Sequence, residues 1–177
     1  MTHQDAVSLL RGVPAPGESW ADLGAGSGVF TRALSELLGP DGRVLAVDRN
    51  AAALRQIGEA SPDGAAIGAV HADFREALEL PPLDGLLLAN SLHFVRQPVP
   101  VLRHLAGFLR PGGKALFLEY DTPRASPWNP HPLPFARLVQ VAAASGLGGL
   151  QELSRRPSAF GGRELVLAVA LKAGALV

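Results

Sequence analysis

Short apolar runs alternate with segments of helical spacing along the first 120 residues. The apolar runs are continuous, which is typical of parallel strands buried on both faces. One predicted strand ends at Leu23, and the others cover 43–48, 65–71, 83–90 and 115–120. Apolar residues recur at helical spacing in predicted helices over 3–11, 29–38, 50–60 and 99–109. Strands that alternate with helices predict right-handed crossovers and helices on both faces of a sheet.

The alternation of strands and helices stops near residue 120. The segment 121–134 contains five prolines and no periodicity, and such long irregular connections are usually functional. Helical spacing resumes over 135–145. Two predicted strands, 150–155 and 164–171, follow, and the turn-rich link 156–162 between them predicts an antiparallel hairpin.

The composition favours one soluble domain over residues 1–177, long enough to bury a full core. Sixteen basic and 16 acidic side chains cancel, so no overall charge favours nucleic acid or an anionic membrane. No cysteine is present, which excludes disulfides and thiolate metal sites. The N-terminus lacks the layout of a signal peptide and no apolar stretch is long enough to span a membrane, so we expect a cytoplasmic protein.

Glycines at alternate positions follow the first predicted strand, at Gly24, Gly26 and Gly28, and a helix follows them. Because glycine has no side chain, backbone at such a turn comes close to a bound molecule, and the helix N-terminus offers unpaired N–H groups. A strand, glycine turn and helix in this order predict a binding turn at the carboxyl edge of a parallel sheet. Similar turns also occur without a ligand, and the spacing differs from the G-x-G-x-x-G of dinucleotide folds.

Acidic residues follow the second and third predicted strands, at Asp48 and Asp73. Asp48 either caps the next helix or accepts hydrogen bonds from ribose hydroxyls, and Asn50 is available for the cap instead. An acid at this strand end also occurs in nicotinamide-dependent enzymes, where it binds the ribose. Asp73 has its own capping alternative, because Glu76 lies three residues later as in a capping box.

These features in this order resemble the class I S-adenosylmethionine-dependent methyltransferases. The matching stretches are 21–28, 44–48, 72–73, 83–94 and 109–120, and the closing hairpin extends them. The resemblance implies an α/β fold, a doubly wound Rossmann-like seven-stranded sheet of order 3-2-1-4-5-7-6 with strand 7 antiparallel, in a three-layer αβα sandwich. The Asn90-Ser-Leu-His-Phe94 segment is most similar to the branch that methylates small molecules.

The resemblance implies S-adenosyl-L-methionine as cofactor. It places the glycines near the methionine part with Asp22 close to the amino group, Asp48 at the ribose, and Asp73 and Phe74 at the adenine. The ends of strand four would face the sulfonium. The implied cofactor-binding residues are Asp22, Gly24, Ala25, Gly26, Gly28, Asp48, Arg49, Asp73, Phe74, Asn90 and Ser91.

His93 lies where this family borders the substrate pocket, and imidazole titrates near neutrality, so a role as base or in orienting the substrate competes with simple packing. Trp128 and Asn129, an aromatic with a polar neighbour on a loop over the carboxyl edge of the sheet, are candidate substrate contacts, with surface packing as the alternative. Tyr120, at the end of the fifth predicted strand, is a further candidate. Glu119 and Asp121 offer other acid or base groups. The charged hairpin around Arg155, Arg156 and Phe160 is typical of a solvated face.

The predicted reaction is in-line displacement of a methyl group from a sulfonium onto a small molecule, which needs positioning more than a fixed catalytic dyad. His, Asp and Glu do not recur at metal-ligand spacing, so no metal is expected. Two alternatives are a nicotinamide-dependent reductase and a cofactor-binding protein or partner subunit without catalysis. Neutral charge and few lysines disfavour nucleic acid as substrate, and we expect a monomer or homodimer.

Overall fold

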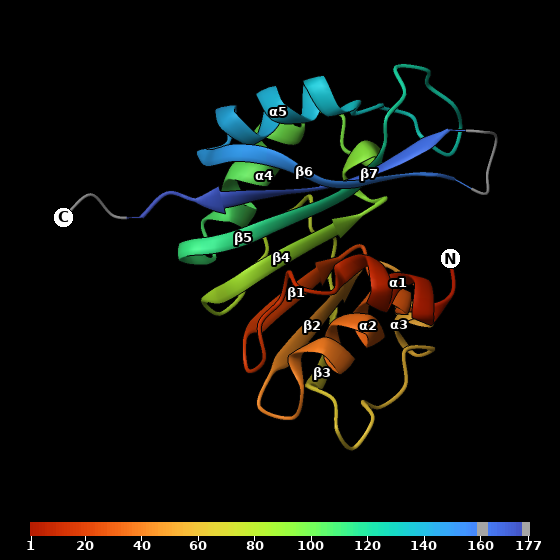
Figure 1. Ribbon diagram of the computed structural model, residues 1–177, viewed down its shortest axis with the longest axis vertical. Coiled ribbons are helices and arrows are strands. Elements are labelled where there is room, and N and C mark those ends of the chain that lie inside the picture. The colour runs from red at the N-terminus through yellow and green to blue at the C-terminus, as the bar shows by residue number, and fades with distance from the viewer. Residues whose placement is uncertain (159–162, 175–177) are drawn as a thin grey trace. The chain divides into compact units, whose positions relative to one another are not determined.

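The computed structural model describes residues 1–158 and 163–174. Chain contacts divide the protein into two compact units, Met1–Leu86 and Leu87–Val177 (Figure 1). Phe160 and most of the predicted hairpin link lie outside the described residues. The prediction of a single domain stays a prediction.

The seven strands form one sheet of order β3-β2-β1-β4-β5-β7-β6. Strands β1, β2 and β3 pair in parallel, whereas β7 runs antiparallel to both β5 and β6. This confirms the predicted α/β fold and strand order. The strands are β1 (Ser19–Leu23), β2 (Arg43–Asp48), β3 (Ala66–His71), β4 (Leu83–Ala89), β5 (Leu109–Tyr120), β6 (Leu147–Pro157) and β7 (Glu164–Lys172).

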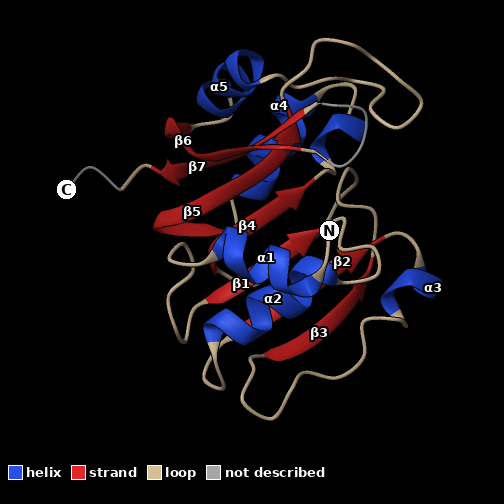
Figure 2. Ribbon diagram, turned by 45° about the vertical axis from the view of Figure 1, so that its right-hand side comes forward, coloured by secondary structure: helices blue, strands red, loops and turns tan. Residues whose placement is uncertain are grey.

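In the first unit, helix α2 (Val29–Leu38) packs on β1–β3, and α1 (His3–Leu10) packs beside α2 (Figure 2). Helix α2 buries Leu34 and Leu38 completely, as its apolar spacing predicts. The parallel register pairs Leu23 with Val47 and Asp48 with His71. The carboxyl ends of the three strands therefore lie at one edge of the sheet.

Helix α3 (Ala51–Leu54) is much shorter than the predicted helix over 50–60. After Leu54 the chain continues in turns, with Ile57 N–H bonded to the carbonyl of Leu54. Gly58 then takes a φ of 73°, which ends any helical path. The helical prediction over 55–60 is wrong because this glycine turn overrides the local spacing.

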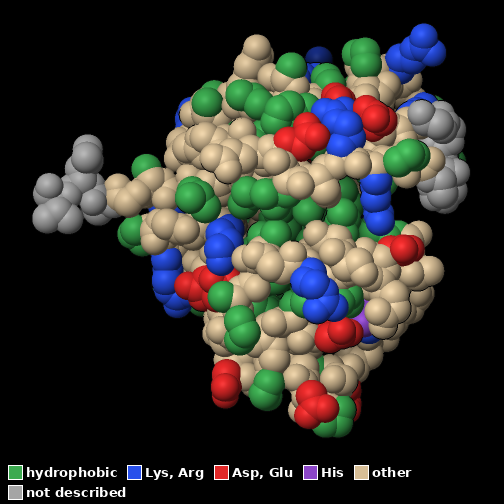
Figure 3. Space-filling model, viewed as in Figure 1, with side chains coloured by type: hydrophobic (Ala, Val, Ile, Leu, Met, Phe, Trp, Pro, Cys, Tyr) green, Lys and Arg blue, Asp and Glu red, His purple; other side chains and the backbone are tan. Residues whose placement is uncertain are grey.

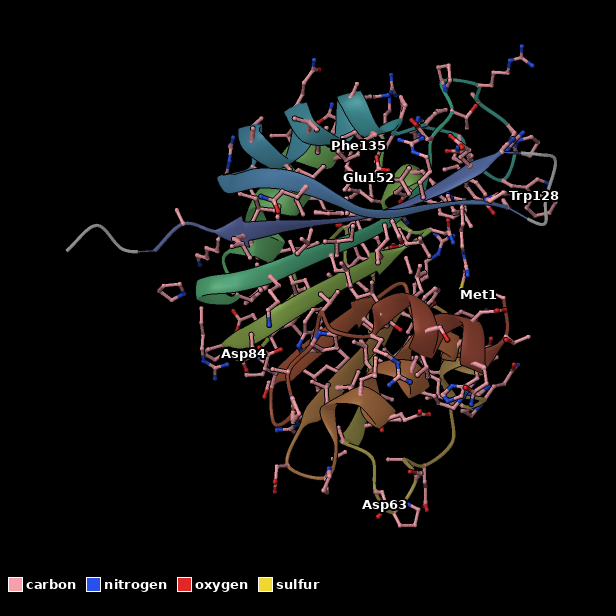
Figure 4. All side chains as sticks on the ribbon, in the orientation of Figure 1. Met1, Asp63, Asp84, Trp128, Phe135 and Glu152 are labelled. Atoms are coloured by element: carbon pink, nitrogen blue, oxygen red, sulfur yellow. The ribbon has the colours of Figure 1, made fainter. Side chains whose placement is uncertain are left out.

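Trp20 anchors the core of the first unit and is completely buried. Its indole Nε1 donates to Oε2 of Glu18 over 2.9 Å, so the polar edge of the ring is paired. Gly85 lies against the ring, where a Cβ would come within 2.2 Å of the indole. One residue earlier, Asp84 accepts the N–H of Ser19 over 2.8 Å at the start of β4 (Figure 4). Close approach of the indole therefore explains a glycine inside a buried strand.

The second unit contains α4 (Pro98–Ala106), α5 (Phe135–Ala144) and a short 3₁₀ helix, η1 (Leu92–Phe94). Helix α4 packs on β5, and α5 packs on β6 and α4. Strand β5 pairs with β7 in register from Lys114–Leu171 to Tyr120–Leu165. The predicted helices over 99–109 and 135–145 are therefore confirmed, although α4 ends at Ala106.

Strand β5 begins at Leu109 instead of residue 115. The segment 110–113, which lies between the predicted helix and the predicted strand, belongs to the strand. Pairing with β7 begins only at Lys114, so the first residues of β5 extend past that neighbour. Pro111 has no N–H, and Gly112 has a φ of 76°. Neither residue interrupts a hydrogen bond to β7, because β7 does not pair with this part of β5. Strand β6 likewise begins earlier than predicted, at Leu147.

Candidate functional site

The glycine loop between β1 and α2 is held by the end of β2. The N–H groups of Gly24 and Ala25 donate to the carbonyl of Val47 over 2.8 and 3.1 Å. Ala25 also packs against the buried cluster that contains Leu54 and Ile57. All three glycines of the loop have positive φ, from 54° at Gly26 to 83° at Gly24. The sequence spacing thus produces a tight turn fixed to its neighbouring strand.

Gly28 forms the N-cap of α2 at a φ of 81°, and no side chain caps the helix there. A Cβ at Gly28 would lie 2.7 Å from Cγ1 of Ile57, so both conformation and space require glycine. Gly28 therefore offers no side-chain acceptor to the first turn of α2, in which the backbone of Thr31 bonds the Asp22 carboxyl. The N–H groups before Thr31 suit an anionic or polar ligand group.

Asp48 joins the end of β2 to the glycine loop. Its Oδ2 accepts the N–H of Gly26 over 2.8 Å, and its Oδ1 accepts the N–H of Asn50 over 2.8 Å. Asn50 caps α3 by accepting from Ala52 and Ala53. The capping alternative for Asp48 is therefore wrong. Each carboxylate oxygen has a further lone pair, so Asp48 retains capacity to accept from a ligand.

Asp22 lies beneath the loop with its side chain 1% exposed. Its Oδ2 accepts the hydroxyl of Thr31 on α2 over 2.7 Å, a partner that the sequence reasoning missed. Burial raises the pKa of Asp22 from 3.8 to about 6; the hydroxyl of Thr31 opposes this rise, and the charge of Asp48 adds to it. The buried carboxyl thus connects the strand end to the first turn of α2.

Asp73 and Phe74 follow β3 in a turn. Arg75 donates from its backbone N–H and Nε to Oδ1 of Asp73 over 3.0 and 2.8 Å. The hydrogen bond from the Arg75 side chain is the largest cause of the lowered pKa of Asp73. No helix begins here, and Glu76 N–H bonds only the backbone carbonyl of Asp73, so the capping-box alternative is wrong. Phe74 is buried.

Arg49 follows Asp48 directly and places its carbonyl 3.0 Å from Nε2 of His71, the residue paired with Asp48 across the sheet. His71 therefore has a local backbone partner. The structure thus brings together Asp22, the glycine loop, Asp48 and Arg49 within the first unit.

In the second unit, β4 is followed by a strained residue with unpaired polar groups. Asn90 is the one non-glycine residue with positive φ, 52°, among residues 1–158 and 163–174. Its N–H bonds the carbonyl of Leu118 over 2.8 Å. Its Oδ1 and the hydroxyl of Ser91 are buried without a hydrogen-bond partner. Backbone strain and unpaired buried groups are both common at functional sites.

His93 and Glu119 form a buried pair whose side chains are 2% and 3% exposed. Nδ1 of His93 lies 2.6 Å from Oε2 of Glu119. The other oxygen, Oε1, accepts the backbone N–H groups of Leu92 and His93 over 3.1 and 3.3 Å. Glu119 was among the candidate acid or base groups, but its pairing with His93 was missed; a charged residue within the apolar run 115–120 was the available signal.

Residues 121–134 form an irregular loop, as predicted. The loop contacts η1, because the N–H of His131 donates to the carbonyl of His93 over 3.0 Å. Tyr120, just before it, has its ring centroid 6.4 Å from that of His93. Trp128 is 81% exposed and lies at the outer side of the loop, away from Phe135 (Figure 4). Asn129, beside it, is 1% exposed, and neither atom of its amide has a partner.

Arg155 ties the hairpin to the start of this loop. It pairs with Asp121, Glu152 and Glu164, and Figure 3 shows acidic side chains on both sides of a basic one on this face. Asp121 also accepts the N–H of Phe135 at the start of α5 over 2.9 Å. Burial acts to raise the pKa of Asp121, but these donors outweigh it and the pKa is lowered. Arg155 is exposed, as expected of a solvated face, and it also pairs with three carboxylates that the sequence did not indicate.

Across the described parts of the chain, no three His, Asp or Glu side chains gather as metal ligands. Among these same residues, no helix combines the length and the hydropathy needed to cross a membrane.

The sequence is similar to curated methyltransferases. It is 32% identical over 116 residues to the ubiquinone/menaquinone biosynthesis C-methyltransferase UbiE of Vibrio campbellii, covering 63% of this chain and 45% of that protein. The same enzyme from Pseudomonas paraeruginosa is 32% identical over 121 residues, covering 66% and 47%. The match thus spans less than half the length of these relatives.

Solved structures share the fold. A 1,6-didemethyltoxoflavin-N1-methyltransferase of Burkholderia thailandensis superposes with a TM-score of 0.75 at 21% identity, over 97% of this chain and 78% of that chain. A SAM-dependent methyltransferase of Aquifex aeolicus gives 0.74 at 16% identity, over 96% and 90%. A methyltransferase domain family matches residues 21–115, more than half of the chain. The protein therefore belongs to the methyltransferase domain family, as its resemblance to class I S-adenosylmethionine-dependent methyltransferases implied.

Proposed function

We propose that this protein transfers a methyl group from S-adenosylmethionine to a small molecule. The observation that carries the proposal is the glycine loop anchored through Gly26 to Asp48, followed directly by α2, whose N-cap Gly28 has no side chain. Bound there, the cofactor supplies an electrophilic methyl group, and the chain positions the reactants and excludes water.

The residues of the first unit fit an adenosyl ligand. The backbone of Gly24, Ala25, Gly26 and Gly28 would border the methionine part, near the buried Asp22. The free lone pairs of Asp48 would accept the ribose hydroxyls, with Arg49 adjacent. Asp73 and Phe74 would contact the adenine.

Two groups of the second unit also suit a polar ligand. The buried Oδ1 of Asn90 and the hydroxyl of Ser91 have no hydrogen-bond partner within the described protein. A ligand group that donates a hydrogen bond to them would remove them from that costly state.

Small molecules are the acceptors that the relatives support: one is named a ubiquinone/menaquinone biosynthesis C-methyltransferase, and another a 1,6-didemethyltoxoflavin-N1-methyltransferase. Tyr120, Trp128 and Asn129 are the proposed acceptor contacts. Equal numbers of acidic and basic side chains give no support to a nucleic acid acceptor. Cytoplasmic location and a monomeric or homodimeric state stay predictions.

Isothermal titration with S-adenosylhomocysteine and with NAD tests the cofactor assignment. We expect saturable binding of the first compound and none of the second. NAD binding without S-adenosylhomocysteine binding would replace the methyltransferase with the reductase alternative. Transfer of a labelled methyl group to an acceptor then separates an enzyme from a cofactor-binding subunit.

A further inference from the structure

Glu119 is a carboxylate whose hydrogen bonds all lead to the segment that carries His93. Its Oε1 accepts the N–H groups of Leu92 and His93, and its Oε2 lies 2.6 Å from Nδ1 of His93. Two backbone donors stabilise negative charge on the carboxylate. An ionised carboxylate only accepts hydrogen bonds, so Nδ1 must carry the proton. In a neutral imidazole with Nδ1 protonated, the lone pair is on Nε2.

We propose that His93 and Glu119 act as a proton-accepting pair, in which Nε2 of His93 removes a proton from the methyl acceptor and Glu119 positions the ring. The proposal rests on the proposed function and deepens it. It assigns the acceptor class as small molecules with an ionisable O–H, such as phenols and enols.

Burial argues against a purely structural pair. Both side chains are nearly inaccessible, and Glu119 stands in a strand otherwise filled by residues such as Phe117 and Leu118. Removing a carboxylate from water costs several kcal/mol, and an apolar pair of similar volume packs at least as well. Proton transfer at Nε2 of His93 explains why a carboxylate is buried here, whereas packing alone does not.

The surroundings of His93 suit a polar acceptor. The loop residue His131 donates to the His93 carbonyl, which places the 121–134 segment on η1. In that segment Asn129 has an amide that is buried without partners, and unpaired buried groups also precede η1 at Asn90 and Ser91. An acceptor with oxygen atoms would satisfy such groups while presenting its O–H to His93.

The O–H bond of the acceptor breaks and its proton moves to Nε2, which leaves an imidazolium beside the Glu119 carboxylate. The electron pair on oxygen forms the new O–CH₃ bond, or the conjugated carbon of an enol forms C–CH₃. The S–CH₃ bond breaks, and its electron pair stays on sulfur as a neutral thioether. Such a base contributes about two to four orders of magnitude in rate.

A matched control lies on the surface of the same protein. His3 and Glu36 form a pair of nearly equal length, 2.7 Å, but their side chains are 36% and 49% exposed. Glu36→Gln therefore removes a histidine–carboxylate contact without touching the proposed pair.

Nitrogen-15 NMR of the histidine rings tests the pair without any acceptor. We expect wild-type His93 to show the Nδ1–H tautomer at neutral pH, and Glu119→Gln to shift it toward Nε2–H. The Nε2–H tautomer in the wild type would overturn the proposal, even where Glu119→Gln fails to fold.

Kinetics with labelled S-adenosylmethionine and a panel of simple phenols and cyclic 1,3-diketones completes the test. We expect Glu119→Gln to lower kcat about 100-fold while KM and S-adenosylhomocysteine affinity stay within about two-fold, and Glu36→Gln to change neither. Full kcat in Glu119→Gln, or no methylation of either compound class by a protein that binds S-adenosylhomocysteine, would overturn this proposal alone. A wild type that binds no S-adenosylhomocysteine would overturn the proposed function itself, and the transfer step with it.

Discussion

The backbone N–H of Gly26 donates to Oδ2 of Asp48 over 2.8 Å, across 22 residues of sequence. A glycine turn and an acid after the next strand are each weak signals of a binding site in the sequence. In the structure they are joined by a hydrogen bond. Because Asp48 also accepts the N–H of Asn50, it fixes the position of the loop relative to the end of β2.

Asp48→Asn is expected to weaken S-adenosylhomocysteine binding about 10- to 100-fold, because a hydrogen bond to a charged acceptor is worth about 1.5–3 kcal/mol. Titration calorimetry measures the change. Asp63→Asn is the control: Asp63 is an exposed carboxylate in the turn before β3, at the opposite ends of the parallel strands (Figure 4). Equal affinity in both variants would leave Asp48 with a role in loop structure only.

Asp22→Asn is expected to stabilise the protein near neutral pH but not in acid. The folded-state pKa of about 6 lies above the ordinary value of 3.8, so the folded protein holds this proton more tightly than the unfolded chain. Stability contributed by this group therefore falls as pH rises from about 4 to about 6, by about 3 kcal/mol in full.

Urea unfolding of both proteins at about pH 4 and about pH 7.5 measures this difference. Asp22→Asn should have a higher free energy of unfolding than the wild type at the higher pH but not at the lower one. The reason is that the Asn amide does not ionise and still accepts the hydroxyl of Thr31. A difference that does not change with pH would contradict the raised pKa.

Gly85→Ala is expected to destabilise the fold by about 1–3 kcal/mol or more, because the new Cβ would overlap the Trp20 indole. Atoms of the ring lie 2.2–2.4 Å from that position. Gly148→Ala is the control, since its Cβ would lie 3.6 Å from the Leu171 carbonyl oxygen, an ordinary contact. Thermal melts should separate the two variants, and equal melting temperatures would show that Trp20 moves aside at little cost.

Asn129→Ala is expected to leave stability unchanged or raise it by about 1 kcal/mol, because the amide is buried without partners. The KM for the acceptor should rise about tenfold or more if the amide binds it. Asn50→Ala makes the same truncation at a helix cap and should cost about 1 kcal/mol. Equal destabilisation of the two variants would mean that the Asn129 amide is satisfied in the free protein.

Much of the fold follows from local pattern. Continuous apolar runs marked the buried strands, and their order with the helices led to the family resemblance and its sheet order. The errors arose where a local rule competed with a longer-range one. Gly58 shortened α3 despite helical spacing, and strand β5 extended through Pro111 and Gly112 because its early residues lie beyond β7.

The site was predictable where chemistry follows from backbone position, as for the glycine loop and Asp48. It was not predictable where partners come from distant segments. Nothing local to Glu119 indicates His93, 26 residues away, and nothing local to Asp22 singles out Thr31. Arg155 is exposed as expected, but its pairing with Asp121, 34 residues away, was not predictable from the local sequence.

A crystal structure of the protein soaked with S-adenosylhomocysteine tests the central claim most directly. We expect electron density for the ligand beside residues 22–28, with both ribose hydroxyls within hydrogen-bond distance of the Asp48 carboxylate. Density elsewhere in the protein, or an unchanged glycine loop with no ligand at saturating concentration, would contradict it.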